Sequence, residues 1–402
     1  MAGVEPMSIT AQELEAAAQE IMADVIAIRR HLHQNPELSG QEINTAAYLA
    51  EKCRRLGCDV REQIGGHGLL VQLPAKSSVS LPTVILRADM DALPIQDGKQ
   101  SDYSSKVNGV SHACGHDVHS AILLGTLMLL TKLNIALPFN IAAIFQPAEE
   151  ITEGASAMIR DGVLDDLHPH RAYALHVYPY LPAGSIGLRA GAMCAAADMF
   201  EVEITGHGGH AARPHECIDV ILVASHIIQA LHHIISRRVD PMHPAVLTIA
   251  QIEAGHAANV IPDKVRFSGT IRSLDRTSHE EIRTRMDHII RQTAETWGAT
   301  ATFQMRHATP MLENSDEGVE DIRTALKQWA PNIPVVEIAE PSMGGEDFAE
   351  FLEHTSGCLM RLGTGSSPAS RYPLHHGCFD IDEQAMLAGI LTLASLCMSA
   401  KT

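Results

Sequence analysis

Short apolar segments of strand length alternate with helical patterns through the first half of the chain. Strands are expected at residues 68–73, 82–87, 139–145 and 172–177, and helices at 10–32, 41–56, 119–133 and 154–161. This alternation is typical of a mostly parallel sheet flanked by helices, an α/β fold. In such folds the functional side chains gather at the carboxyl ends of the strands.

The order of the predicted elements changes from about residue 196. A strand (198–205), a helix (218–237), two strands (245–252 and 264–274), a helix (278–297) and a strand (299–307) follow one another. The order β-α-β-β-α-β indicates a ferredoxin-like sandwich, after which helices and strands alternate again. We therefore predict three segments: residues 1–195 and 309–402 form one catalytic domain, and residues 196–308 form an inserted lid or dimerisation domain.

Composition narrows the class of protein. The 402 residues are 46% hydrophobic, and 48 Asp+Glu against 30 Lys+Arg give a formal net charge of −18. That charge argues against binding to nucleic acid or to an anionic membrane surface. We find no run of 18 apolar residues and expect neither a membrane span nor a signal peptide. Eight scattered cysteines do not form a disulfide framework, so a reducing, cytoplasmic location is expected.

The segment His112-Ala113-Cys114-Gly115-His116-Asp117 holds a thiol, two imidazoles and a carboxylate within six residues. Cys114 and His116 can turn toward one point, and thiolate and imidazole are ligands that borderline metals accept. Gly115 between them has no Cβ to crowd the turn. The alternative is a buried cysteine beside an Asp-His pair that caps the following helix.

Further metal-type side chains follow other predicted strands. Asp89 and Asp91 lie at the end of one strand, Glu149 and Glu150 directly after another, and His176 and His375 near later ones. Adjacent buried glutamates repel each other and need a cation or solvent. If one of the two glutamates binds a metal, its neighbour can take a proton from water. The alternative for this pair is a solvated helix start that interacts with the helix dipole.

Taken together, these residues resemble the M20 metallopeptidases, in particular the amidohydrolase branch that includes auxin-conjugate hydrolases, hippurate hydrolases and N-acyl amino acid deacylases. The resemblance covers nearly the whole chain. It is carried by residues 31–39 (HLHQNPELS), 87–94 (RADMDALP), 112–117 (HACGHD), 146–150 (QPAEE), 208–212 (GGHAA), 259–262 (NVIP), 269–272 (GTIR) and 345–348 (GEDF). One departure is the sequence His375-His376-Gly377, where relatives often have a proline; the resemblance favours His375 over His376 as a ligand.

The resemblance implies a zinc-peptidase-like catalytic domain and assigns roles residue by residue. It implies two divalent ions, zinc or manganese first and cobalt or nickel as alternatives, held by Cys114, His116, Glu150, His176 and His375, with Cys114 as the bridging ligand. Glu149 corresponds to the general base, and Asp89, Asp91 and Asp117 to partners that orient the ligands. In the inserted domain His210 corresponds to the donor to the oxyanion, and Asn259 and Arg272 to contacts with the substrate carboxylate. Gly344 could let the backbone approach the same carboxylate, and a plain turn is the alternative for it.

The expected reaction is hydrolysis of an N-acyl amino acid by water held at two metal ions, in a homodimer. His210, Asn259 and Arg272 all lie outside the catalytic domain, so closure or association must complete the site. The helix at 218–237 has an apolar face (Ile221, Leu222, Ile228, Leu231) suited to pairing. Alternative functions are a dipeptidase or carboxypeptidase, an N-acetyl-diaminopimelate deacetylase, and a metal-stabilised binding protein without activity.

Overall fold

A computed structural model describes residues 9–73 and 81–399 of the chain. Residues 1–8, part of the segment in which no signal peptide is predicted, lie outside the described residues. The chain forms two compact units. Unit 1 contains residues 1–191, 313–339 and 350–402, and unit 2 contains residues 192–312 and 340–349. The predicted division at residues 195/196 and 308/309 stays a prediction; residues 340–349 belong to unit 2.

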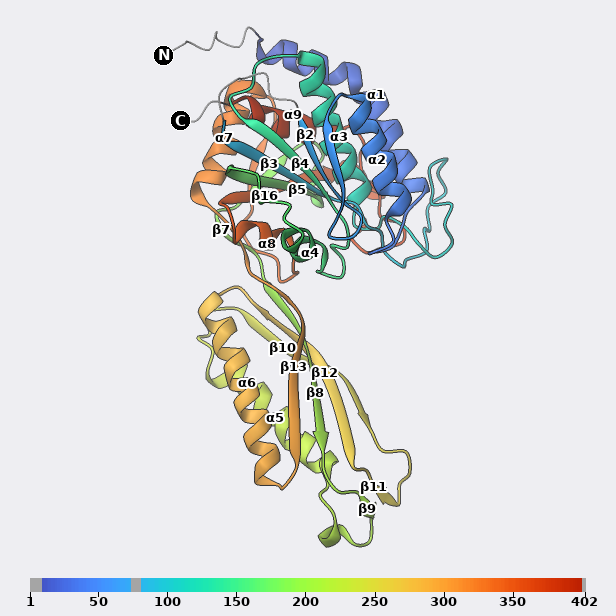
Figure 1. The fold of residues 1–402 in the computed structure, drawn as a ribbon, viewed down its shortest axis with the longest axis vertical. Helices are drawn as coiled ribbons and strands as arrows, with labels where there is room; N and C mark the ends of the chain where they lie inside the picture. Colours follow the sequence, from blue (N-terminus) through green and yellow to red (C-terminus); the bar gives the residue numbers. More distant parts are fainter. Residues whose placement is uncertain (1–8, 74–80, 400–402) are drawn as a thin grey trace. The chain divides into compact units, whose positions relative to one another are not determined.

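Unit 1 is built on an eight-stranded sheet with the order β1-β2-β4-β3-β5-β16-β6-β15 (Figure 1). Its strands are β1 (Asp59–Ile64), β2 (Gly68–Leu73), β3 (Thr83–Asp89), β4 (Asn140–Gln146), β5 (Pro169–Pro182), β6 (Ile186–Leu188), β15 (Val335–Glu337) and β16 (Gly357–Gly365). The central pairings β4-β3, β3-β5 and β5-β16 are parallel, whereas β1-β2, β2-β4 and β16-β6 are antiparallel. The predicted α/β sheet is therefore present, with antiparallel strands added outside the parallel centre.

Helices bury both faces of this sheet. The helices of the unit are α1 (Ala11–Gln34), α2 (Ile43–Arg55), α3 (His116–Leu133), α4 (Gly154–Arg160), α7 (Asp316–Trp329) and α9 (Ala385–Met398). On one face Val84, Leu86 and Ala88 of β3 join a core that also contains residues of α1, α3, α7 and α9. Ile85 points the other way and is also fully buried. Burial on both faces explains why these strands are continuous apolar runs in the sequence.

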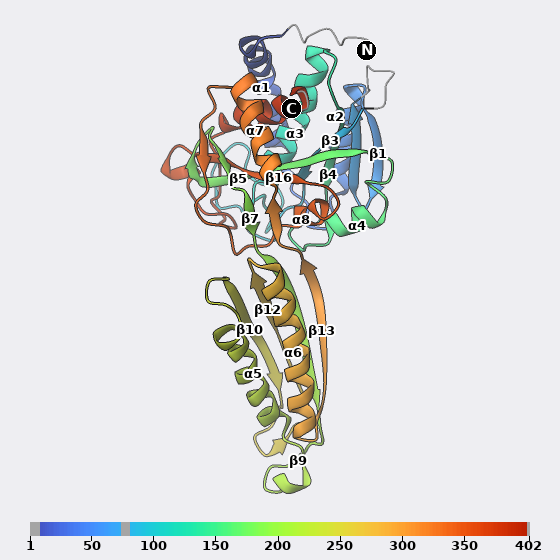
Figure 2. The same ribbon diagram turned by 90° about the vertical axis from the view of Figure 1, so that its left-hand side faces the viewer.

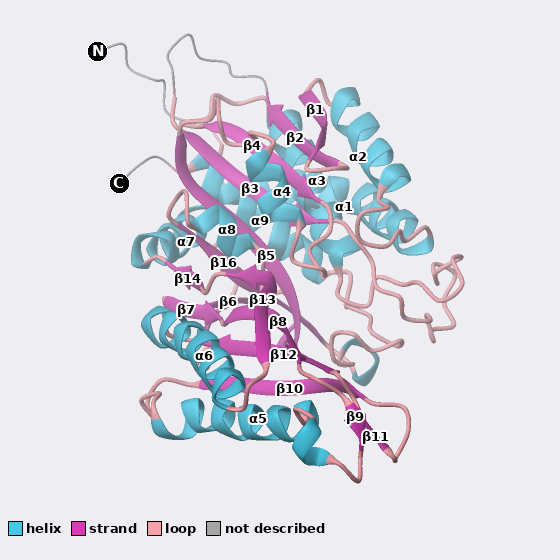
Figure 3. Cartoon of the chain, turned by 60° about the horizontal axis from the view of Figure 1, so that its bottom comes forward, coloured by secondary structure: helices cyan, strands magenta, loops and turns pink. Residues whose placement is uncertain are grey.

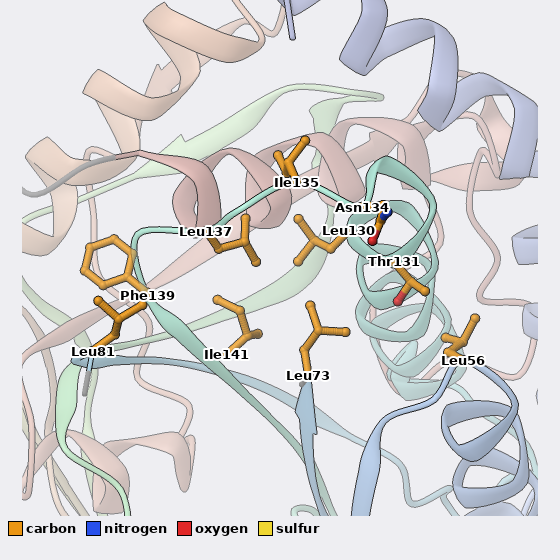
Figure 4. Close-up of a pocket in the computed structure, with 10 residues that line it drawn as sticks. All are labelled: Leu56, Leu73, Leu81, Leu130, Thr131, Asn134, Ile135, Leu137, Phe139 and Ile141. Atoms are coloured by element: carbon orange, nitrogen blue, oxygen red, sulfur yellow. The ribbon is translucent and has the colours of Figure 1, made fainter. Parts of the chain in front are cut away.

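An apolar cavity of unit 1 near this core does not coincide with the candidate metal ligands. It has a volume of about 190 Å³ and is lined at the amino-terminal ends of β3 and β4 by Leu81, Phe139 and Ile141, and by Leu130 near the end of α3 (Figure 4). Among the candidate ligands, Glu150 follows the opposite, carboxyl end of β4, and Cys114 and His116 lie at the start of α3. Its walls are mostly aliphatic and aromatic, with Thr131 and Asn134 as polar members, so the described residues that line it offer no thiol, imidazole or carboxylate for the chemistry predicted above.

Unit 2 is a four-stranded antiparallel sheet with two helices on one face (Figures 2 and 3). In chain order its main elements are β8 (Ala196–Thr205), α5 (Val220–Arg237), β10 (Ala245–Ala254), β12 (Lys264–Ser273), α6 (Arg276–Thr296) and β13 (Thr300–Thr309). The spatial order β10-β12-β8-β13 is that of the predicted ferredoxin-like unit. A short ribbon of β9 (Gly209–His210) and β11 (Val260–Ile261) and the 3-10 turn η1 (Pro214–Glu216) extend from it. The strands β7 (Gly191–Cys194) and β14 (Leu312–Asn314) and the helix α8 (Phe348–Leu352) lie where the chain passes between the units, and η2 (Pro368–Ser370) belongs to unit 1.

Helix α5 packs one face on the sheet and exposes part of the other. Leu231 is fully buried in the core of unit 2, so its predicted place on an outward apolar face is wrong. Ile221 and Leu222 are the members of that set that are exposed, at 45% and 48%. Among the residues described, α5 is the one helix long and apolar enough to cross a membrane, a test that a helix covering a sheet also passes.

Candidate metal centre

The end of β3 supplies two buried carboxylates. Asp89 is the last residue of the strand, and Asp91 follows two residues later. Asp91 accepts a hydrogen bond from His116 Nδ1 at 3.0 Å and another from the backbone N–H of Glu150 at 3.0 Å. Ser39 Oγ donates to the same carboxylate at 2.7 Å. Asp91 therefore holds two predicted ligands in position, the ring of His116 and the backbone of Glu150.

Glycine is required at the start of α3. Gly115 is the N-cap residue and has a left-handed backbone with φ of 87°. A Cβ at this position would lie 2.5 Å from Cγ2 of Val177. Because glycine adopts this conformation without a steric cost, the chain can turn here and place Cys114 before the helix and His116 at its first position.

Cys114 belongs to two groups of candidate ligands in unit 1. One group consists of Cys114, His116 and His176, and the other of Cys114, Glu150 and His375. Within each group the potential ligand atoms lie within 4.8 Å of one another. The five residues singled out from the sequence thus converge on one place, and the thiol is the member that the two groups share. Such a pattern suits two cations with a common sulfur ligand.

The two later histidines are oriented by backbone contacts. His176 Nδ1 bonds the carbonyl oxygen of Val177 at 2.8 Å, which leaves Nε2 directed at Cys114 Sγ, 3.5 Å away. His375 has a left-handed backbone with φ of 62°, and its N–H donates to the carbonyl oxygen of Ala113 at 2.8 Å. Its Nε2 lies 3.5 Å from Oε2 of Glu150.

His376 has other partners than the candidate ligands. Its Nδ1 accepts a hydrogen bond from the backbone N–H of Cys378 at 3.0 Å, and its ring stacks on Tyr372. The next residue, Gly377, accepts a hydrogen bond from Gly98 N at 2.8 Å, and a Cβ on Gly377 would lie 2.6 Å from the carbonyl oxygen of Gln96. Glycine in place of proline thus lets this loop dock closely on the segment at residues 96–98.

The buried polar atoms at this place fit a bound cation. His116 Nε2 and Glu150 Oε1 are both buried and have no hydrogen-bond partner among the described residues. Burial, together with the nearby carboxylates of Glu150 and Glu149, raises the pKa of the Cys114 thiol well above its ordinary value. A thiolate here therefore needs a neighbouring positive charge. Burial also lowers the pKa of His176, which favours the neutral imidazole that binds metals.

Glu149 lies beside the ligands in a strained turn. Glu149, Glu150 and His116 form a further group of nearby ligand atoms, and Glu149 Oε2 lies 3.8 Å from His116 Nε2. The preceding Ala148 has a left-handed backbone with φ of 53°, and its N–H donates to Oε1 of Glu42 at 2.8 Å. Sequence analysis did not single out Glu42, because 106 residues separate the two partners and no local pattern links them.

Asp117 differs from its predicted role as a partner of a ligand. Its Oδ2 accepts hydrogen bonds from Arg29 Nε at 2.9 Å and from His33 Nδ1 at 2.7 Å, and the side chains of all three residues are fully buried. Although burial opposes its charge, Arg29 and His33 hold the pKa of Asp117 well below its ordinary value. Asp117 thus ties α1 to the first turn of α3, and its hydrogen bonds to Arg29 and His33 do not orient the neighbouring ligand candidate His116.

His119 is a buried histidine that sequence analysis missed. It forms a group of nearby ligand atoms with Asp89 and His116. Asp89 was predicted to orient a ligand, and the structure places its Oδ1 2.6 Å from His119 Nδ1. The spacing of three residues from His116 was a usable signal, since side chains at this spacing share one face of a helix.

The four predicted substrate contacts lie in unit 2, at two ends of its sheet. His210 is paired with Val260 in the β9-β11 ribbon, and the carbonyl oxygen of Asn259 accepts a hydrogen bond from Ala211 N at 3.2 Å. Both side chains are exposed at this end, beyond β8 and β12 (Figures 1 and 2).

Arg272 and Gly344 lie at the other end of the sheet. Arg272 pairs with Ala197, and a Cβ on Gly345 would lie 3.3 Å from Arg272 Nη1, so the backbone at residues 344–345 runs close to the guanidinium. Arg272 is half-buried, and burial lowers its pKa. A half-buried guanidinium of this kind is suited to binding a carboxylate.

The predicted clamp of Asn259 and Arg272 on one carboxylate is therefore wrong for a single copy of unit 2. Lys264 begins β12 and Arg272 lies eight residues further along it. At about 3.3 Å per residue, this stretch alone separates the two ends by about 26 Å. The sequence could not reveal this, because strand length and register decide the separation.

Several known proteins are similar to this chain in sequence. The sequence profile of Peptidase family M20/M25/M40 matches residues 85–399. A protein of Synechocystis sp. named as a probable hydrolase is 42% identical over 384 residues, which cover 95% of this chain and 97% of that protein. N-acetyl-L-cysteine deacetylase of Bacillus subtilis is 38% identical over 363 residues, which cover 90% of this chain and 85% of that protein.

A solved structure is also similar over most of the chain. It is the YxeP protein of Bacillus subtilis, described as a dinuclear metal binding peptidase of the M20 family. The TM-score is 0.80 at 31% sequence identity, and the match covers 94% of this chain and 98% of that one.

Proposed function

Because this chain belongs to Peptidase family M20/M25/M40, a family of hydrolases, we propose that it is a dinuclear-metal amidohydrolase that cleaves N-acyl L-amino acids to a carboxylic acid and a free amino acid. The family resemblance inferred from the motifs is thereby confirmed. The observation that carries the proposal is the sharing of Cys114 between two groups of candidate ligands, beside the buried carboxyl of Glu149.

Five side chains would hold the two ions. Cys114 would bridge them, His116 and His176 would complete one group, and Glu150 and His375 the other. Thiolate and imidazole favour zinc, and the carboxylates also admit manganese, cobalt or nickel. When bound, two such ions lower the pKa of water and polarise a carbonyl oxygen.

The protein's own groups then supply proton transfer and positioning. Glu149 is buried and held by the strained turn at Ala148, so it would accept a proton from the attacking water and deliver it to the leaving amine. Arg272, half-buried against the backbone of Gly345, would bind the α-carboxylate of the substrate, with Gly344 beside it. His210 would donate a hydrogen bond to the oxyanion.

The separation of about 26 Å along β12 supports a homodimer in which His210 and Asn259 serve the site of the other subunit. A small N-acyl amino acid cannot reach from one end of this sheet to the other. The edge strand β10 and helix α5 offer a surface for pairing, with Val246 and Ile252 exposed on β10 and Ile221 and Leu222 on α5.

A peptidase is the second candidate, since the similar Bacillus subtilis structure is described as one. The two functions differ in the acyl part of the substrate, the part that carries the scissile carbonyl. An N-acyl amino acid presents an uncharged acyl group, whereas a dipeptide presents an ammonium. N-acetyl-diaminopimelate deacetylation is a special case of the first function.

The test is a substrate panel with protein reloaded separately with each candidate metal. N-acetyl, N-benzoyl and indoleacetyl amino acids are compared with N-acetyl-diaminopimelate and with dipeptides, and the free amino acid is measured. Faster release from N-acyl amino acids supports the proposal, and faster release from dipeptides supports a peptidase. No release from any of them by metal-loaded protein would favour a binding protein.

Glu149→Gln is the matched variant for this panel. It retains the shape of the side chain but cannot take up the proton, so turnover is expected to fall by roughly 100- to 10,000-fold. Elemental analysis should find the metal content of wild type. A variant that loses metal and keeps its activity after reloading would show that Glu149 and Glu150 have exchanged roles.

A further inference from the structure

His119 lies beside two of the proposed metal ligands. Its ring centroid is 4.7 Å from that of His176 and 5.5 Å from that of His116. It is buried in the first turns of α3 and shares a group of nearby ligand atoms with Asp89. By distance alone it could be taken for a sixth ligand.

Both ring nitrogens of His119 already have partners. Nδ1 lies 2.6 Å from Oδ1 of Asp89, and Nε2 accepts a hydrogen bond from the backbone N–H of Val177 at 2.9 Å. A backbone N–H can only donate, so Nε2 must offer its lone pair, and the proton of the neutral ring must be on Nδ1. A nitrogen that uses its lone pair in this way has none left for a metal.

The carboxylate that fixes this tautomer is itself held in place. Asp89 Oδ2 accepts a hydrogen bond from Arg87 Nη1 at 2.7 Å, and Arg87 Nε donates to Gln146 Oε1 at 2.8 Å. All of these side chains are buried. The orientation of the His119 ring is thus set by a chain of buried polar contacts that starts on β3 and β4.

Val177 needs a partner from outside the sheet on this side. The pairing of β3 with β5 ends at Arg87 opposite Ala174, so Val177 lies beyond the last partner on β3. On its other side β5 continues beside β16, with Val177 opposite Leu362. His119 Nε2 takes the place of the missing strand and satisfies the N–H of Val177.

This contact bears directly on His176. The Val177 N–H belongs to the peptide unit that joins it to His176, and the carbonyl oxygen of Val177 bonds His176 Nδ1 at 2.8 Å. Building on the function proposed above, we infer that His119 is a positioning residue and not a ligand: through the Val177 backbone it holds His176 Nε2 toward Cys114.

The experiment measures Zn²⁺ binding to the full chain after metal removal, by competition with a chromophoric chelator. In wild type two ions bind, each with its own affinity. His119→Leu removes the acceptor for Val177 N–H, and the loss of such a ligand-orienting contact is expected to weaken one of the two ions by about 10- to 100-fold. The affinity for the other ion should not change. His119→Gln offers an amide oxygen to the same N–H and should restore most of the lost affinity.

A matched control separates positioning from general destabilisation. His279 in unit 2 is also a buried histidine beside a buried aspartate, with Nε2 2.8 Å from Asp198 Oδ2. His279→Leu therefore removes a similar pair without touching a proposed ligand, and both Zn²⁺ affinities should stay at wild-type values. Thermal unfolding of the metal-free proteins shows whether the two leucine variants lose comparable stability. If His119→Leu does not fold, Asp89→Asn tests the same chain of contacts and should weaken the same ion.

The outcomes are distinct. Wild-type affinities in His119→Leu would overturn the inference while leaving the proposed function intact. Equal loss in His119→Gln and His119→Leu would also overturn it, because it would mean that His119 is itself a ligand. Wild type that binds fewer than two ions would instead contradict the proposed function.

Discussion

Mixing two inactive variants tests whether His210 serves the partner's active site. His210→Ala removes the proposed oxyanion donor, and one such donor is worth roughly 100- to 1,000-fold in kcat. Glu149→Gln removes the proton acceptor and should be at least as inactive. Each variant alone should bind two metal ions, because neither residue is among the five proposed ligands. Each variant is purified separately, and the two are then mixed at equal concentration under conditions that allow the subunits to exchange.

The size of the recovery follows from the geometry of unit 2. His210 and Arg272 lie at opposite ends of a sheet in which the β12 stretch alone spans about 26 Å, so in the proposed arrangement one small substrate meets them from different copies. In a mixed dimer the site with intact Glu149 then receives the intact His210 of the partner, and the other site has neither. Random exchange makes about half of the dimers mixed, so about one quarter of all sites become active. Hydrolysis of the best N-acyl amino acid should rise to about one quarter of the wild-type rate.

Arg272→Ala provides the control pair. Arg272 pairs with Ala197, only five residues after the start of unit 2 at Ala192, so we expect it to serve the site of its own chain. Mixing Arg272→Ala with Glu149→Gln should then give no recovery. If mixing His210→Ala with Glu149→Gln also fails, although mass spectrometry confirms exchange, the service between subunits is refuted. A closing motion within one chain would then have to bring His210 to the site without Arg272, because β12 keeps the two residues apart within unit 2.

Three further predictions concern metal binding and stability. Cys114→Ser removes the proposed ligand shared by both groups, so the binding of both ions should be weakened. Elemental analysis should find the largest loss of bound metal at limiting metal concentration; loss of a single ion would contradict the proposal that Cys114 bridges the two ions. Arg29→Met removes the buried cation that pairs with Asp117, which is buried, and with Asp380 and Glu383, which are partly buried. It should lower the free energy of unfolding by about 3–5 kcal/mol in urea denaturation; a change under about 1 kcal/mol would refute the network around Arg29. Although burial opposes its charge, His33 and the N–H groups of Ser105 and Lys99 hold the pKa of Asp97 well below its ordinary value. The stability that the Asp97 carboxylate contributes is therefore present above about pH 4 and lost as the pH falls through its folded-state pKa. Asp97→Asn should be less stable than wild type at pH 6, and its free energy of unfolding should approach that of wild type near about pH 2.

Local patterns in the sequence were sufficient to predict most elements of both units. The helices α1, α5 and α6 and the strands β4 and β12 lie within a few residues of their predicted bounds, because apolar periodicity reflects which face of each element is buried. Short strands such as β6, β9 and β15 were not predicted. They contain two or three residues, too few for a period, and exist because a neighbouring strand supplies their hydrogen bonds.

The chemistry of the candidate metal centre could also be inferred from residue types. Cys114, His116, Glu150, His176 and His375 are of the residue types that bind metals, the family resemblance selected them as ligands, and the structure brings them together. The contacts that orient them were less accessible. Asp91 was expected to orient a ligand and does bond His116, whereas Asp117 was expected to do the same and instead bonds Arg29 and His33. Both are aspartates near a ligand in the sequence, and only the packing of α1 on α3 distinguishes them.

The sequence by itself determined the longer elements, the order β-α-β-β-α-β of unit 2 and the set of candidate metal ligands, because these depend on local periodicity and on residue chemistry. Tertiary structure alone decided which partner each buried polar group has and how far apart the substrate contacts lie. His119 bonds the backbone of Val177, 58 residues away, because the β3–β5 pairing stops at that point. His210 and Arg272 are separated by the length of β12. Both facts arise from strand register, which is fixed only when the strands pair.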